Sequence, residues 1–234
     1  MPRTLLILLF ISLWNLNAQE NEKILFSEAL NSTINTYNSR VDAALESGEF
    51  DYAKSLFDSL VKDHLQGSYI DALEFERFNS GIASTEEFDK PTILLTYASW
   101  CIPSEGEIPV LNKMVERYSD LVDFVVLFWD SKDTVRRLAK SFDKNIHIVY
   151  VDETKNKHMQ TVNLLKHALG LSLSFVMGAD GEILDINRRP PNKMNLSESQ
   201  LFNQNITFLS RQIAAINIDH NININELPES LATF

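Results

Sequence analysis

The sequence has 234 residues, of which 44% are hydrophobic and 23% are charged, with a formal net charge of −11 and an isoelectric point near 4.9. This composition is ordinary for a globular protein and excludes a fibrous or disordered chain, and the length allows one large core with a smaller appendage. The acidic balance argues against nucleic acid as a partner, because nucleic-acid-binding proteins need a basic face.

Residues 1–18 have the pattern of a secretory signal. Arg3 precedes an apolar run from Leu5 to Leu13, and the small residue Ala18 offers a cleavage site. The run is short for a membrane span, so we predict cleavage and export to the periplasm or another extracytoplasmic space. The alternative is an uncleaved segment, in which case the protein would associate peripherally with a membrane.

Residues 19–68 are predicted to form a helical region. Apolar residues recur at helical spacing over Glu20–Gln66, with a break at Gly48, and Phe50 and Phe57 belong to the apolar side of the second helix. The run after Gly48 resembles the second half of a tetratricopeptide repeat, but a single unit cannot build a peptide-binding solenoid. We therefore predict a helical hairpin packed on the rest of the protein.

Residues 72–216 alternate predicted strands and helices. Apolar runs predict buried strands at Thr92–Ala98, Asp123–Trp129 and Ile146–Val151. Helical spacing predicts helices at 103–118, Ser131–Phe142, Lys157–Leu169 and Ser197–Ile216. Turn residues predict hairpins at Ala72–Ser84 and between Leu173–Met177 and Glu182–Ile186. This order predicts an α/β domain with a mixed central sheet and helices on both faces, followed by a loosely held tail at 217–234.

The single cysteine, Cys101, directly follows the strand predicted at Thr92–Ala98. Pro103 suits the first turn of a helix, so the thiol is expected at a helix N-terminus, where the macrodipole favours a thiolate. The alternative is a buried, inert cysteine. A lone cysteine in an exported protein allows no internal disulfide, so any disulfide must form with another molecule.

The segment around this cysteine, Trp-Cys-x-Pro-x followed by Glu-Ile-Pro, resembles the active-site segment of thioredoxin-fold proteins of the TlpA/ResA-like extracytoplasmic thiol–disulfide oxidoreductase group. Trp100, Cys101, Pro103, Glu107 and Pro109 match the pattern of that group. The resemblance extends over Ala72–Ile186 and implies a thioredoxin-like fold. It also implies thiol chemistry at Cys101 without a cofactor, and a glutamate, Glu107, that tunes the proton chemistry of the thiol. For Glu107 the alternative is a solvated glutamate in the first helical turn, and Trp100 is expected to pack beside the thiol as a lid.

Ser104 stands where the resembled group has its second cysteine. A serine cannot form a disulfide with Cys101, so an intramolecular two-electron cycle is impossible. Three possibilities remain for Cys101: mixed disulfides resolved by an external thiol, an oxidant-sensitive thiol that stops at sulfenic acid, or no redox work. The hydroxyl of Ser104 could donate a hydrogen bond to a thiolate, or Ser104 could be an ordinary first-turn residue.

A second departure from the group lies at Ser172, which aligns with the cis-proline that faces the cysteine in thioredoxin-fold proteins. Because a cis bond without proline costs about 2.5–4 kcal/mol, a trans peptide is expected here. Leu171 and Ser172, together with Trp100, Ile102 and Pro103, are the predicted substrate-binding residues.

Other kinds of site find no support in the sequence. The five histidines have no metal-ligand spacing with acids or with the cysteine, and no phosphate-binding loop or nucleophile elbow is present. The prediction is an exported thioredoxin-like protein with a single redox cysteine, using Cys101, Ser104 and Glu107, whose partners are protein or small-molecule thiols. The alternative is a catalytically inactive thioredoxin-fold scaffold for protein interactions.

Overall fold

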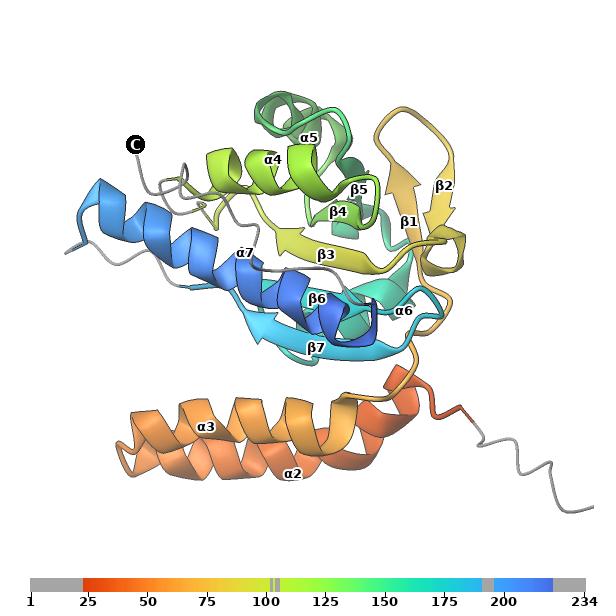
Figure 1. Ribbon diagram of the computed structural model, residues 1–234. Coiled ribbons are helices and arrows are strands. Elements are labelled where there is room, and N and C mark those ends of the chain that lie inside the picture. The colour runs from red at the N-terminus through yellow and green to blue at the C-terminus, as the bar shows by residue number, and fades with distance from the viewer. Residues whose placement is uncertain (1–22, 102, 104–105, 191–195, 221–234) are drawn as a thin grey trace, which may run out of the picture.

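A seven-stranded mixed sheet lies at the centre of the computed structural model, which describes residues 23–101, 103, 106–190 and 196–220 (Figure 1). The strands are β1 (Glu74–Arg77), β2 (Ile82–Ser84), β3 (Thr92–Tyr97), β4 (Asp123–Phe128), β5 (His147–Tyr150), β6 (Leu173–Met177) and β7 (Ile183–Arg188). Their order in the sheet is β2-β1-β5-β4-β3-β6-β7. The pairs β3–β4 and β4–β5 are parallel and the other neighbouring pairs are antiparallel.

Helices cover both faces of this sheet. They are α2 (Phe26–Glu46), α3 (Phe50–Leu60), α4 (Glu107–Tyr118), α5 (Lys132–Leu138), α6 (Met159–Val162) and α7 (Glu198–His220). The hairpin of α2 and α3 packs with α6 on one face, whereas α4, α5 and α7 pack on the other (Figure 1). This arrangement is the predicted thioredoxin-like fold preceded by a helical hairpin.

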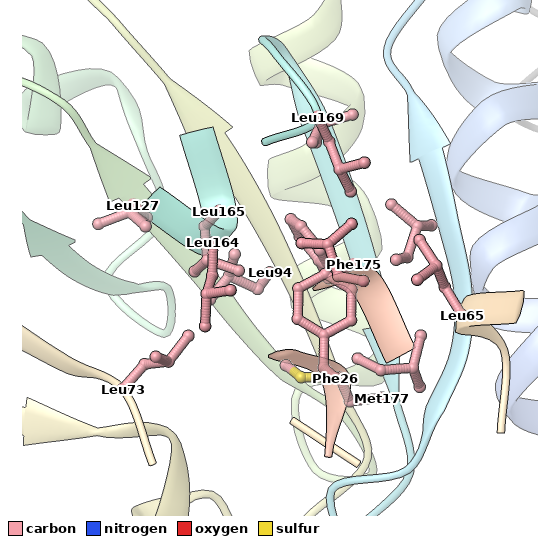
Figure 2. Packing of buried hydrophobic residues seen from close by; sticks show 14 of the residues in the cluster. Phe26, Leu65, Leu73, Leu94, Leu127, Leu164, Leu165, Leu169, Phe175 and Met177 are labelled. Atoms are coloured by element: carbon pink, nitrogen blue, oxygen red, sulfur yellow. The ribbon is translucent and has the colours of Figure 1, made fainter. Parts of the chain in front are cut away.

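The buried strands have apolar side chains on both faces because both faces are covered. In β3, Ile93 and Leu95 belong to the core under α4 and α7, whereas Leu94 belongs to the core under the helical hairpin. Figure 2 shows Leu94 in this second core, with Phe26 of α2 and Phe175 of β6. The rings of Phe26 and Phe175 meet edge to face with centroids 6.0 Å apart. The predicted packing of the hairpin on the domain is therefore confirmed.

The apolar pattern overestimates how much of the hairpin is buried. Phe50, predicted on the apolar side of the second helix, is 68% exposed because it is the first residue of α3, directly after the turn from α2. Helix α7 continues to His220, past the predicted end at Ile216. The boundaries of the predicted domains stay predictions, and the signal segment at 1–18 lies outside the described residues. Within the described part of the chain, no helix is both long enough and apolar enough to cross a membrane.

Candidate functional site

Cys101 lies in the loop that follows β3. The apolar run of β3 ends at Tyr97, and the backbone N–H of Cys101 then donates to the carbonyl of Ala98 at 2.9 Å. The loop is fixed to the next strand, because the backbone N–H of Ser99 donates to Asp130 Oδ2 at 2.8 Å. The cysteine is a free thiol, partly buried, that packs against the core under the helical hairpin. The alternative prediction of a buried, inert cysteine is therefore wrong as far as the burial of Cys101 is concerned.

The predicted start of the following helix at Pro103 is wrong. Helix α4 begins at Glu107, and its N-cap Gly106 has a left-handed φ of 83°. That conformation interrupts a right-handed helix and favours glycine. A Cβ at Gly106 would also lie 2.8 Å from Cδ2 of Phe202 on α7. Cys101 therefore lies five positions before the N-cap of α4, outside the first turn where the helix dipole acts.

The thiol contacts Ser172, the residue directly before β6. The Sγ atom of Cys101 lies 2.9 Å from Ser172 Oγ, and either atom can be the donor. The Leu171–Ser172 peptide is cis, so the expectation of a trans bond is wrong. That expectation considered the isolated peptide alone, whereas the backbone here is bound from both sides: Arg189 N–H donates to Ser172 O at 3.0 Å, and Leu173 N–H donates to Thr96 Oγ1 at 2.9 Å.

A buried polar cluster lies behind this loop. Glu107, the first residue of α4, forms an ion pair with Arg189, which follows β7, and also accepts a hydrogen bond of 2.5 Å from the hydroxyl of Tyr97. The guanidinium carbon of Arg189 lies 3.9 Å from the centroid of the Tyr97 ring. Glu107 is buried, so the alternative of a solvated first-turn glutamate is wrong.

Arg189 connects this cluster electrostatically to the thiol. Burial by itself lowers the pKa of Arg189, but its electrostatic interactions with Tyr97, Glu107 and Cys101 raise it, and the net effect is a raised pKa. Burial and the neighbouring Glu107 carboxylate raise the pKa of Tyr97 well above its ordinary value, so its hydroxyl stays protonated and donates to Glu107. Arg189 thus remains a cation within electrostatic range of Cys101.

The structure describes some of the predicted substrate-binding residues and not others. Trp100 is 67% exposed, so its predicted role as a packing lid is wrong. Leu171 is partly exposed and packs against the same core as Cys101. Pro103 lies in the loop before α4 and is also partly exposed. Ile102 and Ser104 lie outside the described residues.

Sequence reasoning missed Arg189, although the hairpin of β6 and β7 contains a signal for it. Leu173 pairs with Arg188, so Ser172 and Arg189 are adjacent across the two strands. The predicted second strand ended at Ile186, too early to reveal this pairing. Extending the strand to the two arginines would have placed a cation beside the residue that faces Cys101.

Among the residues that the structure describes, no group of three or more histidine, cysteine, aspartate and glutamate side chains could hold a metal ion. The polar groups that the structure places near the sulfur are the Ser172 hydroxyl and, behind it, the buried guanidinium of Arg189.

No family model and no curated protein matches this chain. Solved structures do resemble it. One is described as a candidate thiol:disulfide interchange protein DsbE from Chlorobium tepidum, with 16% identity, a TM-score of 0.48, and coverage of 64% of this chain and 97% of that one. Peroxidoxin BcpB from Mycobacterium tuberculosis has 14% identity, a TM-score of 0.47, and coverage of 66% and 97%. The thioredoxin domain of a thiol-disulfide oxidoreductase from Bacteroides vulgatus has 17% identity, a TM-score of 0.42, and coverage of 61% and 96%. These values describe a distant likeness.

Proposed function

We propose that this chain is an exported, TlpA/ResA-like protein that performs thiol–disulfide exchange through a single thiol, Cys101. The observation that carries the proposal is the distance of 2.9 Å between Cys101 Sγ and Ser172 Oγ, at a sulfur that is only partly buried. Once the sulfur is ionised it can only accept, so the Ser172 hydroxyl becomes the donor. A thiolate is the nucleophile in disulfide exchange, and a hydrogen bond to a charged group is stronger than one between neutral groups.

The buried guanidinium of Arg189 supports the same proposal. Its side chain is 5% exposed and it interacts electrostatically with Cys101. Opposite charges attract more strongly where water is excluded. Glu107 forms an ion pair with Arg189 and accepts a hydrogen bond from the hydroxyl of Tyr97. In our proposal Glu107 therefore positions Arg189 and does not contact the substrate.

The proposed exchange consists of two balanced steps. The thiolate of Cys101 attacks one sulfur of a disulfide, forming a mixed disulfide, while the second half leaves as a thiolate and takes a proton from water. A thiolate from a second molecule then attacks the substrate-derived sulfur of the mixed disulfide, forms a new disulfide with it, and releases Cys101 as a thiolate. The second molecule is needed because Ser104 cannot supply the resolving sulfur.

The proposed substrate-contact surface surrounds the sulfur. It comprises Trp100, whose indole is exposed, Pro103 in the same loop, and Leu171 and Ser172 next to β6. Ile102, which lies outside the described residues, stays part of the proposal on its place in the sequence alone. An exposed aromatic ring beside a reactive thiol offers a large apolar contact to a protein or small-molecule partner.

The test is turnover through a mixed disulfide. Purified protein is incubated with bis(2-hydroxyethyl) disulfide, and the intact mass is followed by mass spectrometry before and after addition of 2-mercaptoethanol. We expect one added hydroxyethylthio group on Cys101, faster than on the urea-unfolded chain, and its release by the thiol. The Cys101→Ser variant controls for other additions. A native thiol that reacts more slowly than the unfolded one would contradict the proposal and favour the inactive interaction scaffold.

A further inference from the structure

A cavity of about 940 Å³ opens beside Ser172. Its wall is formed by the end of β7, one side of α7 and the helical hairpin, and includes Ser172, Phe208 of α7 and Lys54 of α3. Figure 1 shows β7 between α7 and the helical hairpin. The volume lies within the range of small-molecule sites, about 300–1,000 Å³. Ser172 lines the cavity and its Oγ is 2.9 Å from Cys101 Sγ, so the cavity lies next to the residue that contacts the sulfur.

The described lining of the cavity is cationic. It contains Lys54, Arg188, Arg189 and Arg211 and no carboxylate side chain. Arg189 is balanced by Glu107. The guanidinium of Arg188 lies over the Phe57 ring at 4.3 Å and donates to the carbonyl of Leu169 at 3.0 Å, and neither contact neutralises its charge.

The remaining cations of the cavity lining have no acidic partner within the described part of the chain. Arg188, Lys54 and Arg211 form no ion pair with any described residue. Three cations around one cavity therefore have no ion-pair partner among the residues that the structure describes, in a chain whose net charge is −11. A cavity lined by one sign of charge concentrates ligands of the opposite sign.

We infer that this cavity selects the substrate of the thiol, and that the substrate is a small disulfide that carries carboxylates. This inference rests on the proposed function and deepens it. The carboxylates bind among Arg188, Arg211 and Lys54 while one sulfur is presented to Cys101. Attack forms the Cys101–sulfur bond, breaks the sulfur–sulfur bond of the substrate, and releases the other half as a carboxylate-bearing thiolate that takes a proton from water. An acidic protein fits less well, since the net charge of −11 repels it at long range.

The inference also gives the helical hairpin a function. Lys54 of α3 forms part of the wall, and the contact between Arg188 and Phe57 ties the same helix to the end of β7. The appended hairpin thus completes a site whose reactive atom belongs to the thioredoxin-like domain.

The test uses three disulfides of similar size and different charge: 3,3′-dithiodipropionate with two negative charges, bis(2-hydroxyethyl) disulfide with none, and cystamine with two positive charges. The rate of mixed-disulfide formation on the full chain is measured by mass spectrometry, and each rate is divided by that of free 2-mercaptoethanol with the same disulfide. We expect the normalised rates to fall in the order anionic, neutral, cationic, and to converge in 0.5 M salt because screening weakens exposed charges.

The variant Arg211→Gln should lower the anionic rate roughly two- to fivefold relative to the neutral rate, as expected for one partly exposed ion pair. Arg137→Gln removes the same charge from an exposed position on α5 that does not line the cavity, and should leave the whole series unchanged. Equal normalised rates for the three disulfides, or equal effects of the two variants, would overturn the inference while leaving thiol exchange intact.

A binding measurement separates the cavity from the reactivity of the thiol. Cys101→Ser protein is titrated with 3,3′-dithiodipropionate and followed by ligand-detected NMR. We expect binding that is weakened by adding Arg211→Gln and unaffected by adding Arg137→Gln. If Cys101 reacts with none of the disulfides, the proposed function fails. The binding measurement then tests by itself whether the cavity binds anionic disulfides. The inference is overturned if 3,3′-dithiodipropionate does not bind, or if its affinity is the same with and without Arg211→Gln.

Discussion

The Sγ of Cys101 and the Oγ of Ser172 lie 2.9 Å apart although 71 positions separate them in the sequence. The contact joins the loop after β3 to the residue directly before β6, and these two strands pair antiparallel in the sheet. Ser172 occupies the place expected for a proline, which has no side-chain donor. The serine therefore places a hydroxyl at the sulfur that we propose to be reactive.

Replacing Ser172 with alanine should slow alkylation of Cys101 by iodoacetamide at pH 7. The loss of one hydrogen bond predicts a decrease of roughly two- to tenfold, corresponding to about 0.5–1.5 kcal/mol. The measurement is the labelling rate by mass spectrometry, with Ser55→Ala, an exposed serine on α3, as the matched control. An unchanged rate in Ser172→Ala would show that the hydroxyl does not act on the thiolate.

Replacing Arg189 with glutamine should destabilise the protein strongly. The Glu107 carboxylate would remain buried without its cation, and breaking a buried ion pair in this way costs about 3–5 kcal/mol. Glu107→Gln should also destabilise, and the double variant should cost less than the sum of the two single changes because the partners are coupled. Urea unfolding of the four proteins measures this cycle. Additive losses would mean that the pair does not act as a unit.

Tyr97 should make stability depend on alkaline pH. Its pKa is raised by burial first and by Glu107 second, so above about pH 10 the phenol ionises in the unfolded chain before it does in the folded one. The unfolded state then binds fewer protons, and the free energy of unfolding falls as the pH rises. Tyr97→Phe removes the ionisable hydroxyl and with it this pH dependence. The difference in the free energy of unfolding between wild type and variant should therefore narrow above about pH 10. A difference that stays constant up to higher pH would contradict the assignment.

Replacing Gly106 with alanine should destabilise the start of α4. The left-handed φ of 83° disfavours a Cβ, and that Cβ would lie 2.8 Å from the ring of Phe202. The backbone conformation alone costs about 1–3 kcal/mol. Gly48→Ala is the matched control, because Gly48 has a similar φ of 77° and no atom within 4 Å of an added Cβ. Equal losses of stability in the two variants would show that the contact with Phe202 contributes nothing.

Restoring the second cysteine should change the chemistry of the site. In Ser104→Cys, two thiols with the spacing of the resembled motif should form an intramolecular disulfide under mild oxidation. The wild type has one cysteine and can only form disulfides between molecules. Intact mass after alkylation distinguishes these products. A variant that remains fully reduced, or that only dimerises, would show that the loop no longer supports the geometry of the motif.

The strands of this fold follow from the sequence more accurately than its loops do. β6 matches its predicted span, and β3 and β4 each end one residue early, because continuous apolar runs leave little choice for strands covered on both faces. The start of α4 was placed too early because periodicity does not reveal that Gly106 adopts a left-handed conformation against Phe202.

The candidate site was only half predictable. The motif identified Cys101, since its neighbours in the chain carry the resemblance. Arg189 is 82 positions from its partner Glu107, and only the register of the β6–β7 hairpin brings it to Ser172. A bulge between Val176 and Met177 shifts that register, so counting residues from the turn alone would misalign the two strands.

The most direct test compares one thiol in two states. The rate of alkylation of Cys101 by iodoacetamide at pH 7 is measured in the native protein and in the same protein unfolded in urea. An activated, accessible thiolate predicts faster labelling of the native protein than of the unfolded chain. Labelling that requires unfolding would contradict a redox role for Cys101.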